Sequence, residues 1–181
     1  MHSHKYMHTH TGSVFKSGWV ERPPEWHQPS LAREVDTLRS VKDVTNKVLE
    51  TARLDGAIGS SLEAELTLTT NSEPLTSLLS KQHLCEVDSM ATKGDAVEFS
   101  LADLLTVSKV TVSDSEKDEV SDGDGCYSIS EEVDCGGELA RVGAVVRQAS
   151  GSGKHKCPRC WKWTCIADGA LCSRCQLVVD L

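Results

Sequence analysis

The stretch KCPRCWKWTCIADGALCSRC, residues 156–175, holds five of the chain's eight cysteines and two of its four tryptophans. Cys157 and Cys160 form one C-x2-C pair, Cys172 and Cys175 form another, and eleven residues separate the pairs. Each pair can turn two sulfurs toward one point, and four thiolates suit a tetrahedral Zn²⁺ ion. Because four protein ligands leave no position for water, the pattern predicts a structural rather than a catalytic zinc ion.

Other uses of these cysteines remain as alternatives. An iron–sulfur cluster also takes four thiolates. Two disulfides would need an oxidising compartment, and the first residues, MHSHKYMHTHTGS, do not read as a secretion signal. A thioredoxin-like redox pair would need a neighbouring βαβ unit, which the pattern lacks. The other cysteines are expected to be small fillers of apolar space, namely Cys85, Cys126, Cys135 and Cys165.

Charge is distributed unevenly along the 181 residues, whose formal net charge is −8. Residues 113–138 contain ten acidic residues and one lysine, whereas residues 139–181 contain seven basic residues and two acidic ones. A partner responds to the local field, so the basic end can bind a polyanion although the whole chain is acidic.

Basic and aromatic residues surround the cysteine pairs. Cations attract phosphates and exposed indoles stack on unpaired bases, so this mixture predicts contacts with single-stranded or looped nucleic acid. An alternative is that a tryptophan covers the metal-bound sulfurs and that the lysines only keep the chain soluble. For Trp161, packing on the sulfurs is favoured over stacking on a base; for Trp163, the sequence favours neither role. The candidate RNA-binding residues are Lys154, Lys156, Arg159, Trp161, Lys162, Trp163 and Arg174.

The remaining sequence predicts an α+β fold with one long helix. Apolar residues recur at helical spacing from Ser30 to Gly56, with Ser30 as the expected N-cap and Gly56 as the left-handed end. Alternation predicts a strand over residues 60–68, and the Val and Thr content of residues 104–112 predicts a second; residues 137–149 are expected to form a third strand, and residues 74–84 a short helix. The segment 14–29 is expected to be extended and to pack Phe15, Trp19 and Trp26.

The domain boundaries follow from these elements. No apolar run is long enough to span a bilayer, so we expect a soluble chain without a membrane partner. The segments are a disordered start (1–12), a helical segment with the first strand (13–70), a small α/β region (71–112), an acidic mobile loop (113–138), and a strand followed by the four-cysteine zinc knuckle module (139–181).

Several motifs together resemble one family. KCPRCWKWT followed by LCSRC is similar to the C-terminal zinc module of bacterial and organellar isoleucyl-tRNA synthetases. Upstream, SVFKSGW, PPEW and VTNKVLETARLDGAIGSSLEAELTL resemble the end of that family's anticodon-binding helical domain. The resemblance is clear over residues 13–70 and 139–178 and weak between them.

The resemblance implies a function and its limits. It implies that Cys157, Cys160, Cys172 and Cys175 ligate zinc, and that the partner is the anticodon stem-loop of tRNA(Ile). The family's HIGH-like and KMSKS-like signatures, which bind ATP, do not occur in this chain. We therefore expect a monomer that lacks the catalytic and editing domains, depends on the missing catalytic body for aminoacylation, and is inactive alone. The resemblance favours a mitochondrial location, with the cytoplasm as the alternative.

Two further functions remain as alternatives. A family of DNA-repair glycosylases ends in a zinc module with the pattern CxxCQ, as in residues 172–176 here. Those enzymes need an N-terminal Pro-Glu, whereas this sequence begins Met-His. A zinc-stapled protein-interaction module would need no RNA at all.

Overall fold

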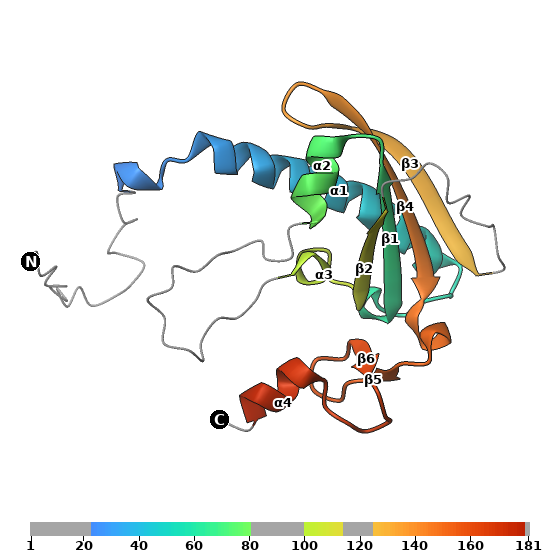
Figure 1. The fold of residues 1–181 in the computed structure, drawn as a ribbon. Coiled ribbons are helices and arrows are strands. Elements are labelled where there is room, and N and C mark those ends of the chain that lie inside the picture. Colours follow the sequence, from blue (N-terminus) through green and yellow to red (C-terminus); the bar gives the residue numbers. More distant parts are fainter. Residues whose placement is uncertain (1–22, 81–99, 114–124, 180–181) are drawn as a thin grey trace, which may run out of the picture.

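The computed structural model describes residues 23–80, 100–113 and 125–179. They form a four-stranded sheet, a long helix across it and a small cysteine-rich module at the C-terminal end (Figure 1). The predicted α+β class is confirmed. The expected disordered start, Phe15 and Trp19 lie outside the described residues.

The sheet has the strand order β2-β1-β4-β3. The strands are β1 (Ala64–Thr70), β2 (Lys109–Ser113), β3 (Cys126–Asp134) and β4 (Leu139–Gln148). β1 pairs in parallel with β2, and the other two pairings are antiparallel. Leu66 and Leu68 alternate with half-buried polar neighbours, as predicted, so one face of the sheet forms the core.

Helix α1 (Pro29–Leu54) confirms the predicted long helix and contacts β3 and β4. Its C-terminal part is buried on the sheet, whereas Leu31 and Val35 in the first turns stay 49% and 38% exposed. The expected cap at Ser30 is wrong: Gln28 is the N-cap residue, makes no side-chain cap bond, and is followed by proline at the first helical position. Gly56 has the expected left-handed conformation, with φ of 73°.

The acidic segment 113–138 is not a loop throughout. Residues 126–134 form β3, while residues 114–124 lie outside the described residues. In β3, Tyr127, Ile129 and Val133 recur with period two and pack against the core, so most of its carboxylates point outward. Glu131 accepts a hydrogen bond from Lys47 of α1 at 2.6 Å.

Other boundaries also differ from the predictions. Residues 61–63 form the 3-10 turn η3 (Ser61–Glu63) before β1, and α3 (Leu101–Leu104) occupies the start of the predicted second strand. The predicted short helix is α2 (Glu73–Ser80), and the residues that follow it lie outside the described ranges. Trp26, in η2 (Pro24–Trp26), is 66% exposed, so its predicted packing is wrong.

The C-terminal module follows β4 through η4 (Ala149–Ser152). It contains β5 (His155–Lys156), β6 (Trp163–Cys165) and α4 (Ser173–Val179). β5 and β6 pair in antiparallel fashion. Within the described ranges, no helix has both the length and the apolar character to cross a bilayer.

Candidate metal centre

The C-terminal module brings Cys157, Cys160, Cys172 and Cys175 together. Their sulfurs all lie within 4.8 Å of one another, and the Sγ atoms of Cys160 and Cys172 are 3.7 Å apart. In a tetrahedral site with metal–sulfur bonds of about 2.3 Å, neighbouring sulfurs are about 3.8 Å apart. A disulfide would need about 2.05 Å. The spacing therefore fits four thiolates around one metal ion.

Backbone hydrogen bonds build the first half of this site. The Cys157 N–H donates to the Lys162 carbonyl at 2.9 Å, and the Trp161 N–H donates to the Cys157 carbonyl at 2.9 Å. Trp161 adopts a φ of 66°, a left-handed conformation that is uncommon for a bulky residue. The turn directs Cys157 and Cys160 toward the same point.

The second cysteine pair lies at the start of α4. The Cys172 N–H points at the Cys157 Sγ atom at 3.5 Å, and the Gln176 N–H donates to the Cys172 carbonyl at 2.9 Å. Three of the four cysteines are buried and Cys160 is half-buried. The sulfurs are thus shielded from water by the turns that present them.

The electrostatics of the cluster favour a cation. Burial acts to raise the pKa of Cys157, but N–H donors from the Cys160 and Cys172 backbone outweigh it and lower that pKa to about 5. Burial, with the neighbouring sulfurs, raises the pKa of Cys160 and of Cys175. Four adjacent thiols cannot all ionise without a positive charge among them, and a bound metal ion supplies that charge.

Cys165 is close to the cluster without joining it. It is buried, and its Sγ atom lies 3.1 Å from the Ala170 carbonyl as a hydrogen-bond donor. It packs with the four ligand candidates, in line with its predicted role as a filler. Cys126 and Cys135 are only half-buried, and Cys85 lies outside the described residues. None of the seven described cysteines forms a disulfide bond.

Five of the seven candidate RNA-binding residues are exposed, and for three of these the described part of the chain shows no ion pair or hydrogen bond to the sheet. Lys154 and Arg159 are exposed, and Trp161 is 61% exposed, so the packing favoured for Trp161 from the sequence is wrong. Burial raises the pKa of the Cys175 thiol, and Arg159, which lies near that thiol, acts more weakly to lower it. We call these three exposed residues, Lys154, Arg159 and Trp161, the open face of the module; the name refers only to their shared exposure.

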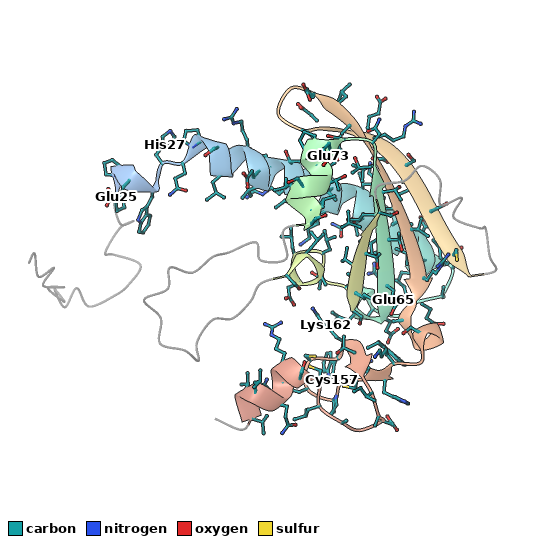
Figure 2. The ribbon with its side chains drawn as sticks, viewed as in Figure 1. Glu25, His27, Glu65, Glu73, Cys157 and Lys162 are labelled. Carbon is teal, nitrogen blue, oxygen red and sulfur yellow. The ribbon has the colours of Figure 1, made fainter. Side chains whose placement is uncertain are left out.

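The other four candidates contact the preceding part of the fold, residues 23–148, which we call the sheet domain, although Lys156 and Arg174 also remain exposed. Lys162 and Arg174 bind Asp103 of α3 at 2.6 and 3.0 Å, and Lys156 binds Glu63 at 3.4 Å. Figure 2 shows Lys162 on the side of the module that faces the sheet. Trp163 donates its backbone N–H to Ser108 Oγ at 2.7 Å, and its indole Nε1 is buried without a hydrogen-bond partner among the described residues.

The two carboxylates that receive these cations were not identified from the sequence. The backbone N–H of Gly59 is the largest influence that lowers the pKa of Glu63, and Lys156 adds to it. Burial acts to raise the pKa of Asp103, but hydrogen bonds from Lys162 and Ser100 outweigh it and lower that pKa to about 2. The S-x-x-D spacing of Ser100 and Asp103 is that of a helix-capping box, and this pattern could have indicated from the sequence that Asp103 is held in place.

Comparisons with known proteins identify relatives but no matching family model. The chain is 32% identical over 169 residues to the isoleucine–tRNA ligase of Gloeothece citriformis, and 34% identical over 170 residues to that of a Synechococcus species. It is 30% identical over 175 residues to the isoleucine–tRNA ligase of Acaryochloris marina. These matches cover 91–93% of the chain but only 16% of each relative.

Proposed function

This chain is homologous to a segment of the isoleucine–tRNA ligases, and from that premise we propose that it is a C-terminal tRNA-binding part of such an enzyme. The four-cysteine cluster holds zinc as a structural ion, and the open face of the module contacts the anticodon stem-loop of tRNA(Ile). The ligase activity in the relatives' name, with its use of ATP, is proposed only for a protein that includes the rest of their length.

The observation that carries this proposal is the open face beside the cysteine cluster. Lys154 and Arg159 supply two cations for phosphates, and Trp161 presents an exposed indole on a hydrogen-bonded turn. Stacking of one base on such a side chain contributes about 1–3 kcal/mol, and phosphate contacts make binding sensitive to salt. Bound zinc would neutralise part of the thiolate charge close to that face.

The test is binding of the zinc-loaded chain to a tRNA(Ile) anticodon stem-loop at two salt concentrations. We expect Lys154→Gln to weaken binding and to reduce the salt slope by about one, as the loss of one phosphate contact predicts. Trp161→Ala should weaken binding at both salt concentrations without changing the slope. The matched control is Arg141→Gln, an exposed arginine at the start of β4, the strand whose other end leads into the module.

The comparison RNAs and DNA decide between the proposed function and its alternatives. A stem-loop with another anticodon should bind more weakly than that of tRNA(Ile). Preference for duplex DNA would instead favour the glycosylase-like alternative, and absence of nucleic-acid binding by the folded, zinc-loaded chain would favour a protein-interaction module. Light scattering tests the proposed monomer, and imaging of the tagged full-length protein tests the proposed mitochondrial location.

A further inference from the structure

One carboxylate joins the cysteine module to the sheet domain. Asp103 Oδ1 accepts hydrogen bonds from Lys162 Nζ at 2.6 Å and from Arg174 at 3.0 Å. Its other oxygen accepts from the Ser100 hydroxyl at 2.8 Å and from the Ser100 N–H at 3.2 Å. The capping box at the start of α3 therefore holds the carboxylate in place through contacts that do not involve the module's cations.

This contact is largely shielded from water. The side chains of Asp103 and Lys162 are only 14% and 17% exposed, whereas Arg174 is 57% exposed. Salt screens such a pair much less than it screens charges on an open surface. The low pKa of the Asp103 carboxyl keeps it ionised at any physiological pH.

A second hydrogen bond lies at the same junction. Ser108 accepts the Trp163 N–H at 2.7 Å and donates its own hydroxyl to the Leu62 carbonyl. Lys162 and Trp163 directly follow Trp161 in sequence. Their contacts with Asp103 and Ser108 therefore attach the end of the Trp161 turn to the sheet domain. The junction therefore determines the direction in which the turn points.

We propose that Asp103 is a positioning residue that docks the four-cysteine module onto the sheet domain. In this arrangement Lys162 and Arg174 serve the contact with Asp103 and do not bind RNA. The open face of Lys154, Arg159 and Trp161 is thereby held in one orientation. The docking role does not depend on RNA; its consequence for RNA binding rests on the proposed function.

The test uses the full, zinc-loaded chain with Asp103→Asn. Asparagine keeps an acceptor for Ser100 but removes the charge that holds both cations. Amide hydrogen exchange at Trp163 reports docking, and exchange at Cys157, whose N–H bonds within the module to Lys162, reports the module's own fold. The matched control is Asp168→Asn, which changes an exposed acid of the same module whose side chain accepts the N–H of its neighbour Gly169.

We expect Asp103→Asn to speed exchange at Trp163 about tenfold while exchange at Cys157 and zinc content stay unchanged. Lys162→Gln, which leaves the capping box intact, should give the same result, and the control should change neither amide. Unchanged exchange at Trp163 in both variants would overturn the proposal. Equal acceleration at both amides would also overturn it, because Asp103 would then be needed for the module's fold rather than its placement.

Binding to the stem-loop gives a second readout. A positioning role predicts that Asp103→Asn weakens binding with an unchanged salt slope. Tighter binding with a steeper slope would contradict it, because Lys162 and Arg174 would then be RNA ligands that Asp103 withholds. If the wild-type chain binds no RNA, the proposed function fails, while the exchange measurements still decide the docking role.

Discussion

The strongest prediction concerns metal removal, because the described residues form two separate buried clusters. The aliphatic cluster of the sheet and α1 shares no buried residue with the cysteine cluster. The cysteine cluster contains four buried cysteines, with only Cys160 and Leu171 packed against it, so it has almost no apolar core. Metal binding to such modules contributes on the order of 10 kcal/mol to their folding. Chelation should therefore unfold the module and leave the sheet folded.

Hydrogen exchange measures this directly. After chelation, the amides of Cys157 and Gln176 should lose protection, while the ladder amides between Leu66 and Val146 should keep theirs. Fluorescence of Trp161 and Trp163 should change at the same time. Loss of protection throughout the sheet would refute the reasoning, because it would show that the two clusters fold as one unit.

A matched pair of cysteine variants sharpens the same prediction. Cys172→Ser removes a proposed ligand and should lower metal affinity by more than the roughly 100-fold found for loss of an outer-shell partner. Cys165→Ser changes another buried cysteine, whose sulfur donates to the Ala170 carbonyl, and it should keep one metal per chain. Metal content after dialysis distinguishes them. Equal loss in both variants would contradict the assigned ligand set.

Three further predictions concern stability. Folding lowers the pKa of Asp103 from 3.8 to about 2, so the chain should lose on the order of 1–2 kcal/mol of stability as pH falls from about 4 to about 2. In an acid titration, Asp103→Asn should flatten this part of the curve of stability against pH. An unaltered curve would show that the Asp103 carboxylate does not cause the loss. Leu66→Ala, at a fully buried position of β1, should cost about 2–5 kcal/mol in urea unfolding, and a loss below about 1 kcal/mol would argue against a packed core there. Gly56→Ala should cost about 1–2 kcal/mol of stability, because alanine is strained at a φ of 73°. Steric overlap should add nothing, since no atom beyond the adjacent residues lies within 4 Å of the added methyl group. An unchanged melting temperature would contradict the left-handed helix end.

The acidic strand shows where the sequence pattern was insufficient. Ten carboxylates in residues 113–138 suggested a loop, yet Tyr127, Ile129 and Val133 carried the period-two signal of a strand. β4 supplies the backbone partners for β3, and α1 covers its apolar side. The composition of residues 113–138 carries no information about the partner strand or the covering helix. The loop prediction therefore missed a strand that tertiary packing stabilises.

Local order in the sequence was enough to predict the long helix, the alternation of β1 and β4, and the four cysteines that converge. Each of these depends on spacing along a short stretch of chain. The roles of the module's cations were decided by the tertiary structure. Lys162 meets Asp103 across 59 residues and Lys156 meets Glu63 across 93, so no local pattern shows that either lysine is paired. An ion pair depends on distance in space and on shielding from water, and only the folded chain establishes both.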